Sequence, residues 1–444
     1  MLFKRKLYDD MLRWKNVDKG ATALLIEGAR RVGKSTLVKD FAQNEYESYI
    51  LLDFSKVSKE IKALFEDISD LNYFFLRLQV LCNVQLKERK SVIVFDEVQL
   101  LPLARQAIKH LVADGRYDYI ETGSLISIKR HVEHIVIPSE ERRVRLYPLD
   151  YEEFRWALGD TATIPLLKIA YSDRKQLGDV VNRKLMRDFR LYMLVGGMPQ
   201  AVSRFIESND MVAVDRVKRD IIQLYEDDFR KIDPSGRISM LFDAIPGELG
   251  KNTSRYQVSG VIGRGTSDEV VARFMAELEA SMTVNMVYHA NDPGAGMSLN
   301  KDIARYRMYL ADTGLFVTLA FKDKDFTENI IYRKLLSDKL DANLGHVYEN
   351  IVAQMLKAAG HELYYYTFPT ESGKHNYEID FLISDKDKIS PIEVKSSGYK
   401  THTSLDVFCR KFSKRIRNKY LIYTKDLYKD RDVLYLPAYM TMLL

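Results

Sequence analysis

The stretch TALLIEGARRVGKSTLVKDFAQ, residues 22–43, decides the fold of the N-terminal part of the chain. Its first six residues are mostly apolar, as in a buried strand. The pattern G-x-x-x-x-G-K-[ST] then runs without a mismatch from Gly28 to Ser35, and helical spacing begins at Thr36. Strand, glycine-rich loop and helix in this order predict a phosphate-binding loop at the edge of a parallel α/β sheet.

The residues of this loop are predicted to bind ATP and Mg²⁺. Glycines let the loop curl so that its backbone N–H groups face phosphate oxygens, and the helix adds its positive N-terminal end. Lys34 is expected to reach the β- and γ-phosphates, and the Ser35 hydroxyl to ligate Mg²⁺. The predicted nucleotide-binding residues are Gly28, Ala29, Arg30, Arg31, Val32, Gly33, Lys34, Ser35, Thr36 and, from a later strand, Ser124.

A second element, SVIVFDEVQ at residues 91–99, is predicted to complete the chemistry. Its apolar residues indicate a buried strand, and Asp96 and Glu97 follow at the carboxyl end, where ligands of open α/β sheets bind. Asp96 is expected to hold the metal ion, and Glu97 to polarise the attacking water. Because the acidic pair follows a complete phosphate-binding loop, the pair predicts ATP hydrolysis with Glu97 and Lys34 as catalytic residues.

Three more apolar runs predict the rest of the sheet: SYILLDFS at 48–55, YDYIETGS at 117–124 and RVRLYPL at 143–149. The second ends in polar groups placed to sense the γ-phosphate. Arg142 and Arg143 are candidates for neutralising transition-state charge, within the chain or across an oligomer. The guanine signature N-K-x-D is missing, since Asn300-Lys301-Asp302 has the wrong spacing, so GTP is not the expected nucleotide.

The composition favours a globular cytoplasmic protein without membrane contact. Of 444 residues, 46% are hydrophobic and 29% charged, and no apolar run reaches the ~20 residues of a membrane span. Two cysteines cannot build a disulfide framework. Eleven Lys and Arg against three Asp lie between Lys395 and Arg431, so basic residues concentrate near the C-terminal end.

Several motifs together resemble a group of prokaryotic AAA-type ATPases whose C-terminal part is catalogued as a domain of unknown function. The motifs are GARRVGKSTL, VFDEVQ, ETGS, YPLDYEEF, LVGGMPQAV, YLADTGLF and HVYENIVAQML. The resemblance implies an α/β protein with four parts. These are a P-loop ATPase domain (1–158), a helical lid (159–245), a winged-helix segment (246–322) and a C-terminal α/β nuclease-like domain (323–444).

The middle of the chain carries two local signals. GGMP at 196–199 interrupts helical periodicity and predicts a helix junction. A capping box at 266–269 predicts a helix, and residues 283–312 predict a β-hairpin, which together suggest a winged helix. DNA binding through that helix is not favoured, because its acidic residues outnumber Arg273 and repel phosphate. A structural or protein-contact role is the preferred interpretation.

The C-terminal part carries Asp380, then Glu393 and Lys395 after twelve residues. Glu393 and Lys395 are two residues apart and share one face of a strand. A hairpin would bring Asp380 beside them, and Glu349 is a further ligand candidate on a preceding helix. This pattern resembles the PD-(D/E)xK nucleases, although Ile379 replaces the proline of the name. The resemblance implies Mg²⁺ at Asp380, Glu393 and Glu349, with Lys395 as a catalytic residue.

Two functions remain open from the sequence. The first is an ATP-dependent enzyme that acts on DNA or RNA through the C-terminal domain, with the basic run from Arg410 to Lys419 as an electrostatic track. The second is a nucleotide-controlled switch or scaffold whose C-terminal domain binds nucleic acid or protein without cutting it. Separately from these two functions, the basic run could be only a solvated helix face, and the acidic hairpin could carry ordinary surface charges.

Overall fold

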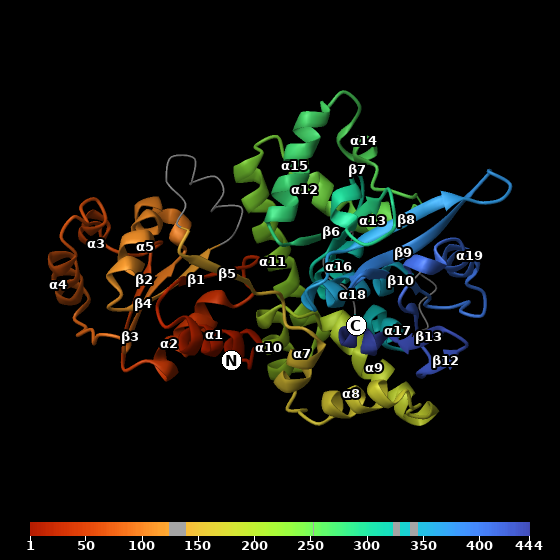
Figure 1. Ribbon diagram of the computed structural model, residues 1–444, viewed down its shortest axis with the longest axis horizontal. Helices are drawn as coiled ribbons and strands as arrows, with labels where there is room; N and C mark the ends of the chain where they lie inside the picture. Colours follow the sequence, from red (N-terminus) through yellow and green to blue (C-terminus); the bar gives the residue numbers. More distant parts are fainter. Residues whose placement is uncertain (124–138, 252, 323–328, 338–344) are drawn as a thin grey trace. The chain divides into compact units, whose positions relative to one another are not determined.

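The computed structural model describes residues 1–123, 139–251, 253–322, 329–337 and 345–444 (Figure 1). They form two compact units. One is built from residues 1–147 with 280–282, and the other from 148–279 with 283–444. The first contains a parallel sheet with helices, and the second contains many helices and a mixed sheet. The predicted α/β class is confirmed.

The sheet of the first unit has five parallel strands in the order β2-β3-β4-β1-β5. Every residue of the three central strands is buried, as expected for apolar strands covered on both faces. β4 lies between β1 and β3 although it follows both in the sequence. The predicted last strand begins earlier and ends at Arg145. The strands are β1 (Ala23–Glu27), β2 (Ser48–Asp53), β3 (Ser91–Asp96), β4 (Asp118–Gly123) and β5 (Glu141–Arg145).

An aromatic core lies on one face of this sheet. Phe54, Phe65 and Phe95 pack edge to face or tilted, with ring centroids 5.6–5.8 Å apart. This core fixes β3 and the turn after it, which carry the acidic residues of the site. The helices of the unit are α1 (Leu7–Asp18), α2 (Lys34–Glu45), α3 (Lys59–Leu64), α4 (Leu71–Cys82), η1 (Val98–Leu100) and α5 (Pro102–Asp114).

The sheet of the second unit has eight strands in the order β12-β13-β11-β10-β9-β8-β6-β7. The predicted hairpin at residues 283–312 forms, because β6 and β7 pair antiparallel. However, β6 also pairs parallel with β8, so this hairpin extends the sheet that the C-terminal strands form. The strands are β6 (Val284–Ala290), β7 (Lys301–Leu310), β8 (Tyr364–Pro369), β9 (Asn376–Asp385), β10 (Lys388–Val394), β11 (Lys419–Tyr423), β12 (Tyr428–Asp430) and β13 (Val433–Pro437).

Residues 159–322 were predicted as a lid and a winged-helix segment. Except for residues 280–282, they belong to the same compact unit as the C-terminal residues. The shared sheet is the physical reason, since its backbone hydrogen bonds cross the predicted boundary between residues 322 and 323. The helices are α7 (Tyr151–Ala157), α8 (Thr163–Asp173), α9 (Asp179–Val195), α10 (Pro199–Ser208), α11 (Met211–Ile232), α12 (Arg237–Asp243), α13 (Ile245–Leu249), α14 (Val258–Ile262), α15 (Asp268–Ala280), α16 (Thr313–Ala320), α17 (Asn329–Leu336), α18 (Gly345–Ala358) and α19 (Thr403–Lys411), with 3₁₀ turns η2 (Met297–Asn300), η3 (Ser413–Arg415) and η4 (Ala438–Leu443).

The GGMP motif is the junction between α9 and α10, as predicted. The Gly197 N–H donates to the Asp312 carboxylate at 2.6 Å, and its carbonyl accepts from the Leu149 N–H at 2.7 Å. Asp312 also caps α16 by accepting from the Leu315 N–H. Three of the motifs that carry the family resemblance therefore meet in one hydrogen-bonded junction, since Leu149 belongs to YPLDYEEF.

Replacing Gly197 with alanine should destabilise the second unit by about 2–4 kcal/mol, because backbone atoms leave no space. A Cβ atom would lie 2.1 Å from the carbonyl oxygen of Leu149. Chemical denaturation measures the loss. Gly247→Ala is the matched control, since no atom lies within 4 Å of its added Cβ. Equal stability of the two variants would contradict this packing.

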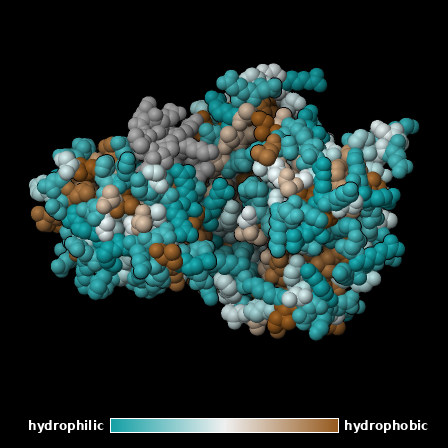
Figure 2. All heavy atoms as spheres, viewed as in Figure 1, coloured by the Kyte–Doolittle hydropathy of each residue, from teal (hydrophilic) through white to brown (hydrophobic). Residues whose placement is uncertain are grey.

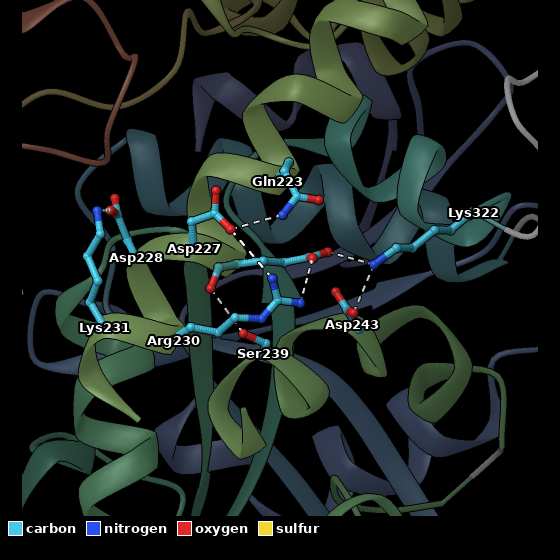
Figure 3. A network of polar contacts seen from close by, with 9 residues as sticks. Gln223, Asp227, Asp228, Arg230, Lys231, Ser239, Asp243 and Lys322 are labelled. Carbon is cyan, nitrogen blue, oxygen red and sulfur yellow. Dashed lines mark hydrogen bonds and ion pairs between the residues drawn. The ribbon is translucent and has the colours of Figure 1, made fainter. Parts of the chain in front are cut away.

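A network of ion pairs connects the C-terminal part of α11 with the neighbouring helix α12 and with Lys322. Figure 3 shows Lys322 pointing towards Asp243, at 2.9 Å, and the same ammonium group lies 2.6 Å from Glu226. Burial raises the pKa of Asp243, and Lys322 opposes this shift. The network links α11, α12 and Lys322, which lies two residues after the end of α16, so we assign it a structural role.

Figure 2 shows one face of the molecule, which is largely hydrophilic, with apolar residues in small separate patches. Among the helices of the described residues, none is long and apolar enough to cross a membrane.

Candidate functional site

The nucleotide-binding loop joins β1 to α2, and two glycines shape it. Gly33 has a φ of +96°, in the left-handed region that glycine adopts without strain. Gly28 has no room for a side chain, because a Cβ atom would lie 2.5 Å from the carbonyl oxygen of Leu146. Helix α2 begins directly after Gly33, so its first N–H groups face the loop.

Lys34 occupies the inside of this loop. Its ammonium group donates to the carbonyl oxygens of Gly28 at 2.9 Å and Ala29 at 3.0 Å. Burial lowers the pKa of Lys34, while the negative charges of Glu97 and Asp96 raise it. The lysine is therefore held by neutral carbonyl groups and lies close enough to both acids to feel their charge.

Ser35 and Asp96 meet although they are 61 residues apart. The Ser35 hydroxyl donates to Asp96 Oδ1 at 2.9 Å, and the Thr122 hydroxyl donates to the same oxygen. The meeting follows from the strand order, since β1, β4 and β3 are neighbours and end at one edge. A hydroxyl and a carboxylate that converge in this way are the hard oxygen ligands that Mg²⁺ prefers. The donor set fits Mg²⁺.

Glu97 lies in the turn that follows β3. Its φ is +56°, which is uncommon for a residue with a side chain. Its N–H donates to the Thr122 hydroxyl at 3.3 Å, and its carboxylate accepts from the Gln99 side-chain amide. Thr122 therefore contacts both acids of the site. Thr122 is one of the polar residues at the end of the run 117–124 that were predicted to sense the γ-phosphate, and the structure adds its contacts to Asp96 and Glu97.

The remaining loop residues differ in exposure. Arg30, Arg31 and Thr36 are exposed, whereas Ala29 and Val32 are buried. Sequence reasoning missed Arg5, which precedes α1. Its guanidinium donates to the Val32 carbonyl at 3.0 Å and to the Tyr147 carbonyl, so it holds the loop against the segment after β5. No local motif marks Arg5, because the contact depends on the folded position of the N-terminal segment.

Two other predictions from the sequence concern Ser124 as a nucleotide-binding residue and Arg142 or Arg143 as a catalytic group. Ser124 lies outside the described residues. Arg142 forms an ion pair with Asp18 at 3.0 Å, and Arg143 forms one with Glu141 at 3.4 Å. The structure gives neither guanidinium a hydrogen bond or ion pair to the described loop residues 28–36. It therefore does not support either arginine as a catalytic group within the same chain.

The second candidate site lies on β9 and β10. These strands pair antiparallel with Phe381 opposite Ile392, which brings Asp380 next to the end of β10. Asp380 Oδ2 accepts from the Val394 N–H at 2.7 Å. The Lys395 ammonium lies 2.8 Å from Glu393 Oε1, so both side chains are on one face as predicted. Asp380, Glu393 and Lys395 form the predicted cluster.

Helix α18 adds Glu349 to this cluster. Burial raises the pKa of Asp380 well above its usual value, and the nearby charges of Glu349, Glu393 and Glu378 raise it further. Glu349 Oε2 accepts from the Tyr309 hydroxyl at 3.1 Å, which orients the carboxylate. We call Glu349, Glu378, Asp380, Glu393 and Lys395 the carboxylate cluster.

Glu378 and Arg307 belong to this site but were not predicted. Glu378 is two residues before Asp380 on β9, so the strand period was a signal that could have found it. Arg307 lies on β7 and forms an ion pair with Glu378 at 2.5 Å. Burial by itself would lower the pKa of Arg307. The net pKa is nevertheless raised, because Tyr309 and three nearby acids stabilise the charged guanidinium: Glu378, Glu349 and Asp380. Only the extension of the sheet by β6 and β7 brings Arg307 to the cluster.

A pocket of about 250 Å³ adjoins the carboxylate cluster. Its walls come from α13 and the segment after it, from β7, and from α18 and β9. Arg255 at this pocket is exposed, and the described residues give its guanidinium no ion pair. The lining residues are Glu248, Leu249, Thr253, Arg255, Tyr256, Arg307, Met308, His346, Glu349 and Glu378.

The basic run near the C-terminal end is partly neutralised. Arg415 pairs with Asp292, Arg417 with Asp385 at 3.4 Å, and Lys419 with Asp432. Arg410 and Lys414 are exposed, and the structure gives neither an ion pair among the described residues. An electrostatic track for nucleic acid stays a prediction that rests on these exposed residues.

The arrangement at the carboxylate cluster supports a metal ion only in part. Glu393 Oε2 is buried without a hydrogen-bond partner in the described part of the chain, as an oxygen reserved for a cation would be. Yet no group of three or more His, Cys, Asp and Glu side chains among the described residues is arranged to hold a metal ion. The oxygen donors suit Mg²⁺, although Lys395 already pairs with the other oxygen of Glu393, Oε1.

Comparison with known sequence families identifies the first part of the chain. Residues 21–155 match the family described as an AAA domain. This segment is therefore similar to AAA domains, and we refer to it below as the AAA domain. Two further families, both described as domains of unknown function, match residues 186–325 (DUF8612) and 344–439 (DUF4143). The second description assigns no activity to the carboxylate cluster, so the resemblance to PD-(D/E)xK nucleases stays a prediction.

The comparisons with curated proteins and with solved structures give no further information about the function of this chain. No curated protein matches the chain. A Pyrococcus horikoshii signal transduction ATPase with numerous domains (STAND) and a tetratricopeptide repeat sensor is 12% identical, with a TM-score of 0.26 over 80% of this chain and 45% of that one. The C. elegans protein PCH-2 is 14% identical, with a TM-score of 0.19 over 36% and 44%. A Vibrio cholerae protein is 10% identical, with a TM-score of 0.18 over 95% of both chains.

The chain therefore spans less than half the length of the first two of these structures. Scores this low support no inference about function.

Proposed function

We propose that the AAA domain hydrolyses ATP with Mg²⁺. The observation that carries this proposal is the meeting of the Ser35 hydroxyl with the Asp96 carboxylate at 2.9 Å, with Glu97 as the next residue. Lys34 would exchange its two carbonyl partners for phosphate oxygens, which are stronger acceptors of a charged donor. Mg²⁺ held by Ser35 and Asp96 would supply positive charge to the β- and γ-phosphates.

The proposed reaction needs a base next to these groups. Water attacks the γ-phosphorus, the bond to the bridging oxygen breaks, and ADP and phosphate are the products. The carboxylate of Glu97 accepts the proton that the water loses. With Arg142 and Arg143 engaged in ion pairs, we expect any arginine that neutralises transition-state charge to come from a second copy of the chain.

We further propose that the carboxylate cluster acts on the phosphodiester backbone of DNA or RNA. Asp380, Glu393 and Glu349 would hold Mg²⁺, whose chemistry is to lower the pKa of bound water. Lys395, released from Glu393, would orient that water or bind a phosphate oxygen. The support is the convergence of buried carboxylates with an ammonium group 2.8 Å from one of them.

The switch or scaffold without cleavage is the second candidate. It is favoured by the ion pair of Lys395 with Glu393 and by the hydrogen bond of Asp380, since both satisfy groups that a metal ion would otherwise need. In that case the cytoplasmic chain would bind nucleic acid or protein with its C-terminal segment and release it in response to ATP.

One assay separates the two candidates. The purified chain is incubated with single- and double-stranded DNA and RNA, with or without ATP, and with Mg²⁺, Mn²⁺ or EDTA. Cleavage that requires the divalent ion supports the enzyme. Retention of nucleic acid on a filter without cleavage under every condition supports the switch. ATP turnover is measured in the same samples, so the proposal for the AAA domain is tested separately.

Helix α15 should not contribute to nucleic-acid binding. Replacing Arg273 with glutamate should leave DNA affinity and its salt dependence nearly unchanged, because four acidic residues on this helix already repel phosphate. Affinity is measured over a range of salt concentrations. Lys414→Glu, in the exposed basic run, is the comparison, and it should lower the slope of log affinity against log salt by about one. If the slope falls by about one unit in the Arg273 variant, Arg273 contacts a phosphate group. The helix α15 would then be assigned a role in DNA binding.

A further inference from the structure

Gln99 lies against the carboxylate that the proposed hydrolysis uses as its base. The residue is 5% exposed and sits in the 3₁₀ turn η1, two positions after Glu97. Its side-chain Nε2 donates to Glu97 Oε2. A carboxylate only accepts hydrogen bonds, so the amide must present its nitrogen to Glu97. The contact therefore has a defined direction.

The turn holds both residues in fixed places. Val98, between them, is fully buried in the aromatic core. The Leu100 N–H donates to the Glu97 carbonyl at 2.9 Å, and the Leu101 N–H donates to the Val98 carbonyl at 3.1 Å. Glu97 is also kept at a φ of +56°, a conformation that persists only where the surroundings enforce it. The backbone of this turn thus places Gln99 beside Glu97.

The oxygen of the Gln99 amide makes no hydrogen bond within the part of the chain that the structure describes. This oxygen, Oε1, is buried. A buried polar atom without a partner destabilises a protein, and an apolar side chain of the same shape would avoid that cost. Stability alone does not explain a glutamine here, whereas orientation of Glu97 does.

We propose that Gln99 is a positioning residue for ATP hydrolysis, which holds the Glu97 carboxylate in the orientation that accepts the proton of the attacking water. This inference rests on the proposed hydrolysis at the AAA domain. Loss of the contact leaves Glu97 free to rotate, and a misplaced catalytic group costs roughly 10- to 100-fold in rate.

The test uses Gln99→Met in the full chain, because methionine has the length of glutamine without its amide. Expected are a kcat for ATP about 10- to 100-fold lower, unchanged KM for ATP, and a melting temperature equal to or above that of the parent chain. Gln85→Met, at an exposed position of the same unit, should change none of these. A merely structural glutamine would instead lower the melting temperature, and that result, or an unchanged kcat, would overturn the proposal.

A double variant shows whether Gln99 acts through Glu97. Single-turnover assays, with the protein in excess over ATP, resolve the residual rate of Glu97→Gln. Adding Gln99→Met should not lower that rate further, because the group being positioned is already lost. A further loss equal to that in the parent chain contradicts the inference. Failure of the proposed function looks different: Glu97→Gln would then hydrolyse ATP as fast as the parent chain.

Discussion

Glu97→Gln should lower kcat for ATP roughly 10²- to 10⁴-fold while ATP binds as tightly as before. The substitution keeps the size of the side chain and removes its ability to take a proton, so only the chemical step suffers. Turnover is measured by phosphate release, and binding by titration with a fluorescent ATP analogue. Glu88→Gln, at an exposed position of the same unit, is the control and should keep the parent rate. An unchanged rate in Glu97→Gln would mean that another group is the base.

Lys34→Ala complements this result at the binding step. We expect ATP affinity to fall roughly 10³-fold, because two charge-assisted hydrogen bonds of about 2 kcal/mol each are lost. Lys39→Ala removes an exposed lysine from the same helix and should leave affinity unchanged. The structure makes the comparison informative, because Lys34 is buried inside the loop whereas Lys39 faces solvent.

Asp380→Ala should abolish the metal-dependent behaviour of the C-terminal site and leave ATP turnover intact. In the parent chain, Mg²⁺ or Mn²⁺ should raise the melting temperature by relieving repulsion among the carboxylates around Asp380. Cleavage of nucleic acid in Mg²⁺ should fall roughly 100-fold or more in the variant, since a ligand of the ion is lost. Asp387→Ala, an exposed acid in the turn of the same hairpin, is the control.

The outcomes of this experiment distinguish three cases. A metal-dependent rise in melting temperature that survives in Asp380→Ala would show that the ion binds elsewhere. A rise that Asp380→Ala removes, without cleavage of any nucleic acid by the parent chain, would favour the switch over the enzyme. Loss of both the rise and the cleavage in the variant supports the enzyme, and Lys395→Met should then lower cleavage without removing the rise.

The carboxylate cluster shows which residues of a site the period of a strand can predict and which it cannot. Asp380, Glu393 and Lys395 were predicted to meet because side chains alternate along a strand and a short hairpin fixes the register. The same period placed Glu378 on the face of Asp380, yet its importance became visible only with Arg307 beside it. Arg307 is 71 positions away from Glu378 in the sequence, and no local pattern links the two residues.

The sequence by itself determined the nucleotide-binding loop, the acidic strand and the two hairpins. Each depends on residues near one another in the chain: glycines that allow the loop, a buried strand that ends in acids, and alternation that fixes strand faces. The tertiary structure alone decided that β4 lies between β1 and β3, that Thr122 therefore binds Asp96, and that β6 and β7 extend the C-terminal sheet. These contacts join distant segments, and they depend on which surfaces pack together, which backbone period and turn chemistry do not specify.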